Sequence, residues 1–392
     1  MVKSLLHPDR MMQEPRLARL GKRDRELVLA FLDALGTSRS PEVPVLKDWQ
    51  RFTKANPTPT DVHVSTELTD MTVAYIQDMS NSAAAGQGVV PVRNVAGQFN
   101  LYDRGDWNRI DIEAARRGPG SESAGGGFKV AQGSYSCITR AWHKDVDEQL
   151  MGNQIAGDPV DDATAYVTQQ LVLIRELVFA TNLLTTGIWT GSTGGGDFTG
   201  VPGAPGANQF KQWDQSGATP REDLSLQAVS IHQQTGRWPN VLVLSPFVLK
   251  ALLLSAEIVQ VFQYTTAGAV PDLDALAKAL VSPAIAAYTP PKITVAGMTQ
   301  TTSAEGVADT FAYIAGKVAL LAYVDPRPSL RSPTAWAVFA WEGLLGANAY
   351  GMRIKDFELP RNGVPHRIEG EFSFDIKQVA PFLGVFFNTA VS

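Results

Sequence analysis

The chain has 392 residues, of which 19% are charged and 44% are hydrophobic, and its formal net charge is -5. A chain of this length exceeds the size at which one hydrophobic core stops growing, so we expect two or three domains. The single cysteine, Cys137, excludes an intrachain disulfide framework, and the acidic net charge argues against a surface that binds nucleic acid throughout.

No apolar run in the sequence approaches the roughly 18 residues that a membrane-spanning helix needs. The longest candidates, residues 318–324 and 381–387, have the length of strands. The first twenty residues contain neither a continuous apolar core nor a small-residue cleavage site, so they do not match a secretory signal. We therefore expect synthesis in the cytoplasm and no contact with a membrane.

Residues 1–60 form a mildly basic N-terminal arm, with eleven Lys and Arg residues against seven Asp and Glu residues. Within the arm, residues 22–36 have the apolar spacing of a helix that ends at a glycine. The Pro- and Ser-rich stretch at 38–60 indicates an extended connector without a core of its own. The basic residues of the arm could contact nucleic acid or an acidic partner, or they could form a solvated helix face.

Residues 62–78 alternate loosely between polar and apolar side chains, which indicates a strand. Residues 89–146 then have an unusual composition for a packed domain, because charges of both signs surround glycine-rich stretches at 118–120 and 125–127. We interpret 89–146 as an extended loop, with two long arms joined by a glycine-rich tip. A projection of this size buries little apolar area against itself, so a neighbour is needed to order it.

A long amphipathic helix is predicted over residues 162–185. Apolar residues recur there at i, i+4, i+7 and i+11, which places them on one face of a helix of six or seven turns. The central stripe consists of Val167, Leu171, Ile174 and Val178, and Leu173, Leu177 and Leu184 widen it.

A second helix is predicted to begin at a capping box and to end at Gly236. Thr219 would be its N-cap, Pro220 its first residue and Glu222 the reciprocal partner three residues on. After it, short strands and helices alternate, which is typical of a mixed α+β unit, and residues 367–391 read as two long strands. The expected strands are 241–245, 292–297, 311–316 and 318–324, and the expected helices start at Ser245, after Ser255 and at Asp272.

The sequence holds few signals for catalysis or metal binding. No phosphate-loop, GxSxG, HExxH or CxxC motif occurs. Cys137 could act as a nucleophile if His143 folded back toward it, but an isolated cysteine at an alternating position is more often a small buried hydrophobe. His143, Asp145, Asp147 and Glu148 offer metal ligands close together, but no second histidine is near, and a solvated charged face is favoured. We therefore predict no catalytic, cofactor or metal site.

Ten short stretches of the sequence carry a resemblance to a known family. In chain order they are YDRGDW (102–107), GSESAGGGF (120–128), SYSC (134–137), HKDV (143–146), DATAYVTQQL (162–171), RELVFATNLLTTGIW (175–189), NVLVLSPFV (240–248), IAGKVALLAY (314–323), PRPSL (326–330) and RIEGEFSFDIKQVAPFLGVFFNTAV (367–391). Together they resemble major capsid proteins of tailed bacteriophages with the Hong Kong 97-type fold. The resemblance covers roughly 85% of the chain, from about Asp61 to the end.

The resemblance implies an α+β fold of four parts. These are the N-terminal arm at 1–60, an extended β-hairpin loop at 89–146, a peripheral domain with a long spine helix at 151–221 and 355–392, and an axial α+β domain at 222–354. It also implies that the loop lies across a neighbouring subunit. The loop residues expected at that contact are Arg104, Asp106, Arg109, Arg116, Arg117, Glu122 and Phe128, and the spine-helix core is Val167, Leu171, Ile174 and Val178.

The function that the resemblance implies is structural, with no substrate turned over. Copies of the chain would form pentamers and hexamers that close into an icosahedral shell, and the shell would hold double-stranded DNA by non-specific contact. Further expected partners are a portal and a scaffolding protein during assembly, and the sequence leaves open whether a decoration protein binds. The expected location is the virion capsid after assembly in the bacterial host cytoplasm. An encapsulin-like cargo compartment with the same fold is the alternative. An α+β enzyme is the other rival, against which the scattered histidines and missing motifs argue.

Two features of the family are open for this sequence. Some members join subunits by a Lys–Asn isopeptide bond, for which Lys129 and Asn388 are loosely placed candidates; no motif supplies the carboxylate, so non-covalent closure is favoured. Many members carry a long scaffolding segment ahead of the arm. About 60 residues with one helix are short for that role, so either a separate scaffolding protein exists or the chain is the mature form.

Overall fold

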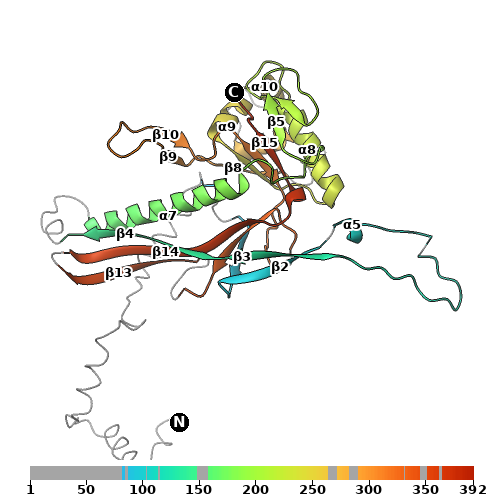
Figure 1. The fold of residues 1–392 in the computed structure, drawn as a ribbon. Helices are drawn as coiled ribbons and strands as arrows, with labels where there is room; N and C mark the ends of the chain where they lie inside the picture. The colour runs from blue at the N-terminus through green and yellow to red at the C-terminus, as the bar shows by residue number, and fades with distance from the viewer. Residues whose placement is uncertain are drawn as a thin grey trace, which may run out of the picture. The chain divides into compact units, whose positions relative to one another are not determined.

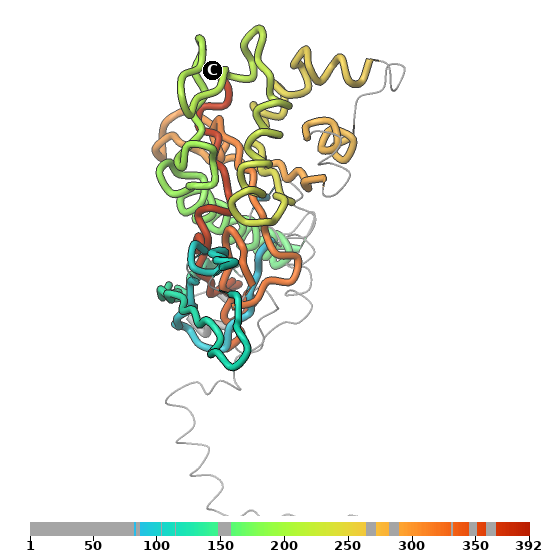
Figure 2. The backbone as a smooth tube through the Cα atoms, turned by 90° about the vertical axis from the view of Figure 1, so that its right-hand side faces the viewer, coloured from blue at the N-terminus to red at the C-terminus, as the bar shows by residue number. Residues whose placement is uncertain are grey.

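Figure 1 and Figure 2 show the computed structural model of the chain from two directions. The structure describes residues 82–83, 87–102, 104–113, 115–147, 158–263, 272–281, 290–330, 332–344, 351–361 and 364–392. The predicted arm, its helix at 22–36, the predicted strand at 62–78 and Glu148 lie outside the described residues. Contacts divide the chain into two units, Met1–Val62 and His63–Ser392, and all that follows concerns the second.

A five-stranded sheet is built around β14 (Val364–Gln378). Two strands pair antiparallel with successive parts of β14, namely β12 (Trp336–Trp341) and β13 (Met352–Arg361). A third, β4 (Ile138–Val146), also pairs antiparallel with β14, over nine residues from Ile138↔Phe374 to Val146↔His366. The short strand β1 (Val89–Val92) completes the sheet by pairing parallel with β12.

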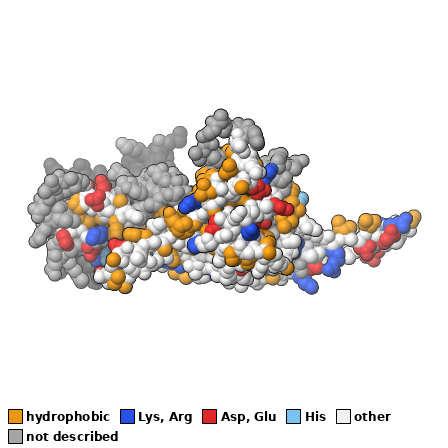
Figure 3. Space-filling view, turned by 90° about the horizontal axis from the view of Figure 1, so that it is seen from above, with side chains coloured by type: hydrophobic (Ala, Val, Ile, Leu, Met, Phe, Trp, Pro, Cys, Tyr) orange, Lys and Arg blue, Asp and Glu red, His pale blue; other side chains and the backbone are white. Residues whose placement is uncertain are grey.

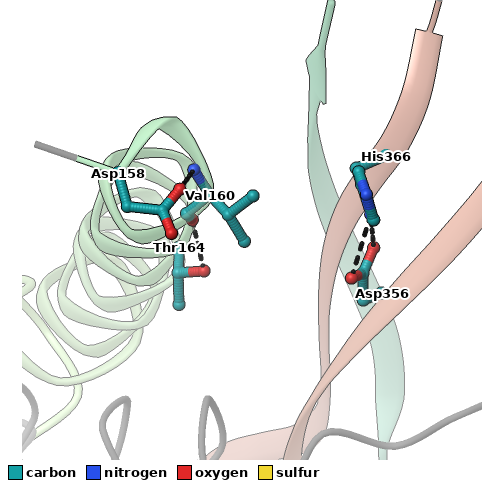
Figure 4. A network of polar contacts seen from close by, with 5 residues as sticks. All are labelled: Asp158, Val160, Thr164, Asp356 and His366. Carbon is teal, nitrogen blue, oxygen red and sulfur yellow. Dashed lines mark hydrogen bonds and ion pairs between the residues drawn. The ribbon is translucent and has the colours of Figure 1, made fainter. Parts of the chain in front are cut away.

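Helix α7 (Pro159–Leu183) packs against this sheet. It starts three residues before the predicted position because the carboxylate of Asp158 accepts a hydrogen bond from the Val160 N–H at 2.9 Å, as Figure 4 shows. Contact with β14 is close: a Cβ on Gly370 would lie 2.5 Å from Cδ1 of Leu171. A glycine at this position is therefore what allows the helix and the strand to approach.

The buried face of α7 is rotated relative to the predicted stripe. Val167 and Leu171 are buried, but Ile174 and Val178 are only partly buried, and Leu177 is 41% exposed. The most buried positions continue instead through residues that the stripe did not include, which are Val172, Arg175, Glu176, Phe179 and Leu183.

Two charged residues on the buried face explain this difference. Arg175 and Glu176 are both buried, so they interrupt the apolar pattern on the face that packs. Glu176 is tolerated there because its carboxylate accepts hydrogen bonds from the Ser82 hydroxyl at 2.7 Å and from the Ala83 N–H at 3.0 Å. These partners are more than ninety residues away in sequence, so periodicity could not reveal them.

A second sheet has six strands and shares a core with four helices. In spatial order the strands are β6 (Gln209–Lys211), β5 (Phe198–Val201), β15 (Gly384–Asn388), β11 (Ala319–Ala322), β7 (Val241–Leu244) and β8 (Lys292–Val295). The helices are α8 (Pro220–Thr235), α9 (Pro246–Leu254), α10 (Ala256–Gln263) and α11 (Leu273–Leu280). A separate hairpin joins β9 (Thr299–Thr301) to β10 (Phe311–Tyr313), and a short 3-10 helix, η2, spans Pro381–Leu383.

Strand pairing groups some segments differently from the predicted domains. The six-stranded sheet contains β5, β6 and β15, whose residues were predicted to lie in the peripheral domain with the spine helix. The five-stranded sheet contains β12, whose residues were predicted to lie in the axial domain. Figure 2 shows β15 (red) running among segments from the middle of the chain. Periodicity identifies a strand but does not identify its partners, which is why the grouping was missed. The domain boundaries otherwise stay a prediction.

The predicted capping box at the start of α8 is wrong in detail. Thr219 makes no side-chain hydrogen bond to the helix. A free backbone N–H in the first turn is instead paired with a side chain of another helix: the Arg221 N–H donates a hydrogen bond to the Glu257 carboxylate of α10 at 3.0 Å. The predicted end is confirmed: Gly236 adopts a left-handed φ of 70°, and its N–H donates to the His232 carbonyl.

In the part of the chain that the structure describes, no single helix combines the length and the apolar character needed to cross a membrane; only the bent pair α9 and α10 meets that test, by length and composition.

Candidate interaction surface on the extended loop

The extended loop is a β-hairpin with a long tip. Its strands, β2 (Ala96–Tyr102) and β3 (Val130–Ser136), pair antiparallel from Ala96↔Ser136 to Tyr102↔Val130. We call these two strands the loop hairpin and residues 108–128 the loop tip. β1 and β4, which the sequence placed in the arms of the loop, belong to the five-stranded sheet. The projection is therefore shorter than the predicted 89–146, because its arms continue directly into sheet strands (Figure 1).

Aromatic side chains fix the base of the loop hairpin to the five-stranded sheet. The rings of Phe99 and Tyr135 stack on Phe339 of β12, with centroids 5.5 Å and 4.5 Å away. Each ring also covers a glycine directly across the hairpin, since Tyr135 pairs with Gly97 and Phe99 pairs with Gly133. A Cβ on Gly97 would lie 2.5 Å from the Tyr135 hydroxyl oxygen. The glycines thus make room for the rings that anchor the hairpin.

Polar contacts add to this anchor at the junction of β3 and β4. The Ser136 N–H donates to the Asp375 carboxylate at 2.9 Å, and the Cys137 N–H donates to the Val95 carbonyl at 2.7 Å. Cys137 is buried, and burial, followed by the nearby Asp375 charge, raises the pKa of its thiol to about 11. A thiol in this state is a poor nucleophile at neutral pH, so Cys137 serves as a small buried side chain.

Above the anchor, three aromatic rings contact one another but remain exposed. The centroids of Tyr102, Trp107 and Phe128 lie 5.4 to 5.7 Å apart, and the side chains are 46%, 61% and 56% exposed. We call these three residues the aromatic cluster. Trp107 ends the single-turn helix α5 (Arg104–Trp107). The aromatic cluster thus joins the two sides of the loop where the loop hairpin meets the loop tip, a place that we call the neck of the loop. Much of its apolar surface remains exposed to solvent.

An apolar pocket adjoins the aromatic cluster. Its volume is about 410 Å³. Tyr102 and Trp107 line it from the loop, and Phe339, Phe382 and Leu330 line it from the body of the unit. The neck of the loop therefore offers both protruding and recessed apolar surface.

Apart from Phe128, which packs in the aromatic cluster, the described residues of the loop tip make local hydrogen bonds and ion pairs. Ile110 and Ile112 are 83% and 76% exposed, so neither is packed within its own chain. Within the described residues of the tip, the ion pair between Arg116 and Glu113, at 3.3 Å, joins side chains that are 80% and 79% exposed. Figure 3 shows hydrophobic and charged side chains interleaved along the projecting segment at the right. Exposed side chains of this kind contribute little to the stability of a single copy of the chain.

Comparison with known proteins identifies the fold. No protein-family model matches the sequence, and no curated protein matches it either. The structure resembles a phage-related protein from Bordetella bronchiseptica, with a TM-score of 0.59 and 20% identity over 84% of this chain and 98% of that one. It also resembles the capsid of the cyanophage P-SCSP1u, with a TM-score of 0.50 and 10% identity over 77% of this chain and 86% of that one. The chain has the Hong Kong 97-type capsid fold.

In the Hong Kong 97-type fold of this chain, α7 is the spine helix and the loop hairpin with its tip is the extended loop. The structure does not bring the seven predicted loop residues to one site. Arg104 contacts its own chain, because it donates to Gln234 at 3.1 Å and lies 4.8 Å from the Phe382 ring. Asp106 accepts the Lys129 N–H at 3.0 Å. Of the others, Phe128 belongs to the aromatic cluster, Arg116 pairs with Glu113, Arg117 donates to the Ser121 carbonyl, and Arg109 and Glu122 are exposed.

Of the exposed apolar residues of the loop, Phe128 was among the predicted contact residues, but the more exposed Ile110, Ile112 and Trp107 were not. Together with Tyr102, these three lie in a stretch that is otherwise polar and glycine-rich. The occurrence of four large apolar residues in an otherwise polar stretch could have indicated a contact surface, because a loop that stays in solvent is usually polar.

Asp145, one of the side chains near His143 that was weighed as a metal ligand, is held by an arginine. Arg367 binds the Asp145 carboxylate with two hydrogen bonds of 2.6 and 2.9 Å, and these lower the pKa of Asp145. Across the described ranges, no group of three His, Cys, Asp or Glu side chains converges on one point. Lys129 lies exposed in the loop, whereas Asn388 lies partly buried on β15 in the six-stranded sheet.

Proposed function

We propose that this chain is the major capsid protein of a tailed bacteriophage, which assembles as pentamers and hexamers into an icosahedral shell around double-stranded DNA. The Hong Kong 97-type fold supports a shell protein. The observation that carries the proposal is the loop, whose aromatic cluster and tip expose apolar side chains that a single copy leaves uncovered.

The position of that surface supports assembly rather than ligand binding. Apolar patches of this kind mark protein contacts on soluble proteins. A projecting element that contacts a different surface on the next copy forms a heterologous contact, and such contacts close into rings when the rotation allows. The anchored hairpin base and the locally held tip suit this role, since the base fixes the direction of the loop.

The remaining parts of the proposal follow from the same role. The chain acts structurally and turns over no substrate. Its partners are other copies of itself, a portal and a scaffolding protein during assembly, and it contacts packaged DNA non-specifically. Its location is the virion capsid, after assembly in the bacterial host cytoplasm.

An encapsulin-like cargo compartment shares this fold and is the alternative. The two functions differ in what the shell contains. Shells that hold nuclease-protected DNA favour the phage capsid, and shells that hold a protein cargo without DNA favour the compartment.

The test is expression of the full chain, alone and with its scaffolding protein, followed by electron microscopy and analysis of the contents. Closed particles are the expected result. A variant in which a short Gly-Ser linker replaces residues 110–127 should keep a near-normal circular dichroism spectrum and lose the ability to form particles. Replacement of the exposed turn at 303–309 of the β9–β10 hairpin by a linker is the matched control.

Two outcomes contradict the proposal. If the unmodified chain forms only a ~42 kDa species at every concentration, with scaffold present, it is not a shell protein. If the variant without residues 110–127 still closes into particles of normal size, the loop plays no part in assembly.

A further inference from the structure

A side chain from the neck of the loop contacts the body of the unit. Arg104 begins the single-turn helix α5, which lies where the loop leaves the body (Figure 1). Its guanidinium donates a hydrogen bond from Nη1 to Oε1 of Gln234 at 3.1 Å and lies 4.8 Å from the centroid of the Phe382 ring. We call these two contacts of Arg104 the brace.

The two partners of the brace lie where the two sheets of the unit meet. Gln234 is in the last turn of α8, which shares a core with the six-stranded sheet. Phe382 is in η2, which connects β14 of the five-stranded sheet to β15 of the six-stranded sheet. Arg104 therefore connects the neck of the loop to the junction between the sheets.

Gln234 is held in the orientation that accepts this hydrogen bond. Its side-chain nitrogen donates to the carbonyl oxygen of Gly191 at 3.2 Å and to the hydroxyl oxygen of Ser230 at 3.2 Å. The amide nitrogen is thus committed to groups of the body, and the amide oxygen is the atom that faces Arg104. The acceptor is therefore a fixed point on the body.

Arginine is the side chain that suits both contacts. A guanidinium group is planar, so it can donate hydrogen bonds from its edge while its face lies on an aromatic ring. The ammonium group of lysine is a compact point charge without such a plane. Lysine at position 104 would therefore keep the charge but would make the two contacts less well together.

The stacked rings at the base of the loop hold only the start of the hairpin. Phe99 and Tyr135 contact Phe339 there. Further along β2, the strand from Phe99 to Tyr102 lines one side of the pocket of about 410 Å³, and Phe382 lines the other. A two-stranded hairpin has little stability of its own. Without a contact from the neck to the body, the neck is free to move toward or away from the body.

Local contacts link α5 to both sides of the loop. Asp106, in the same turn as Arg104, accepts a hydrogen bond from the Lys129 N–H on the returning side at 3.0 Å. The ring of Trp107 contacts that of Phe128, also on the returning side, with centroids 5.4 Å apart. A contact that fixes α5 therefore fixes the neck as a whole.

We propose that Arg104 is a positioning residue of the extended loop. Its side chain, held between Gln234 and Phe382, keeps the neck against the body and sets the direction in which the loop projects before copies meet. A segment that is already oriented loses less conformational freedom on association, so the brace favours assembly. The inference rests on the proposed assembly into shells and adds the residue that prepares the loop for it.

Distances between two spin labels in the unassembled chain test the brace. In a Cys137→Ala background, the labels are attached at Ala131→Cys on β3 and Val229→Cys on α8, both at exposed residues. Arg104→Ala should widen the distribution of label distances by about twofold or more, because the hairpin alone is weakly held, and Arg104→Lys should widen it less. Arg109→Ala removes the same charge from an exposed residue of the tip and is the matched control, which should leave the distribution unchanged.

A double substitution distinguishes the brace from two unrelated effects on packing. Phe382→Leu keeps an apolar side chain but removes the ring on which the guanidinium lies, so it should also widen the distribution. Added to Arg104→Ala, it should cause no further widening, because the contact is already lost. Near-normal circular dichroism spectra are expected from all variants, since Arg104 and Phe382 are only partly buried. Widening that adds up in the double variant would mean that the two residues act separately and would overturn the brace.

The rate of particle formation tests what the brace does in assembly. Arg104→Ala should slow the formation of closed particles by about fivefold or more, because the loop is no longer oriented beforehand. Arg104→Lys should recover part of this loss, and the particles that form should have normal size. Arg327→Ala, at an exposed arginine outside the loop, is the control and should assemble at the rate of the unmodified chain.

The outcomes separate this inference from the proposed function. An unchanged distance distribution in Arg104→Ala overturns the brace, whether or not particles form. A wider distribution with a normal rate of assembly overturns the role of the brace in assembly and leaves the proposed function intact. Absence of particles from the unmodified chain overturns the proposed function, and the distances in the unassembled chain still decide whether Arg104 orients the loop.

Discussion

Helix α7 packs against the five-stranded sheet, whereas the loop tip projects beyond the loop hairpin, and the two long segments differ in what surrounds them. On α7, Leu171 is 1% exposed and packs so closely that β14 needs a glycine at 370. In the tip, Ile112 is 76% exposed, and a Cβ on Gly125 would meet nothing within 4 Å. The comparison shows that α7 is packed within a single copy, whereas the described residues of the tip are largely exposed in a single copy.

The largest effect is expected from a charge placed under α7. Leu171→Asp buries a carboxylate without a partner, which should cost on the order of 3–5 kcal/mol and leave most of the chain insoluble. Leu177→Asp on the same helix is the control, because Leu177 is 41% exposed and should tolerate the change. Solubility and urea unfolding measure both. Equal behaviour of the two variants would mean that the buried face of α7 is assigned wrongly.

A smaller loss of stability is expected when one glycine in each region is replaced by alanine. Gly370→Ala places a methyl group 2.5 Å from Leu171 and 2.7 Å from Val167, so the free energy of unfolding should fall by about 1–3 kcal/mol. Gly125→Ala, in the open tip, should change it by less than about 0.5 kcal/mol. Urea unfolding of the unassembled chain measures both values. A loss at Gly125 as large as that at Gly370 would show that the tip belongs to a core within its own chain.

The elements of the fold were largely predictable because local patterns determine them. The spacing of apolar residues located α7 to within three residues at each end, and the Ser-Pro signal at 245–246 located α9, whose Ser245 side chain accepts the Val248 N–H. Short apolar runs located β7 and β11, all of whose residues are buried. These are properties of neighbouring residues, which a single sequence contains.

Long-range pairing was not predictable in the same way. β15 follows β14 after only five residues but joins the other sheet, and Glu176 is buried because it binds residues 82 and 83. That Gly97 and Gly133 face Tyr135 and Phe99 across the hairpin depends on the register of β2 and β3, which the sequence pattern did not reveal. Composition did indicate that the loop needs a neighbour, but charge drew attention to Arg104 and Asp106, which make contacts within the chain.

The smallest effect on stability is expected for the ion pair in the tip, whose coupling free energy we compare with that of an ion pair in the sheet. Arg353 of β13 lies 2.7 Å from Glu371 of β14, and both side chains are about 15% exposed. Burial by itself raises the pKa of Glu371, but hydrogen bonds from Lys355 and Arg353 outweigh it and lower the pKa. The pair therefore stabilises the fold at pH values above the ordinary carboxyl range, and the stabilisation is lost as the pH falls through the lowered pKa.

A double-mutant cycle to alanine should give a coupling of roughly 1–2 kcal/mol for Arg353 and Glu371 at neutral pH. The same cycle for Arg116 and Glu113, which are 80% and 79% exposed, should give less than about 0.5 kcal/mol, and salt should remove it. Unfolding of the unassembled chain in urea is the measurement, because the tip then has no neighbour. If the tip pair couples as strongly as the sheet pair, the tip is folded as part of the single chain. If it couples only after assembly, the neighbouring copy supplies the order that the sequence of the tip lacks.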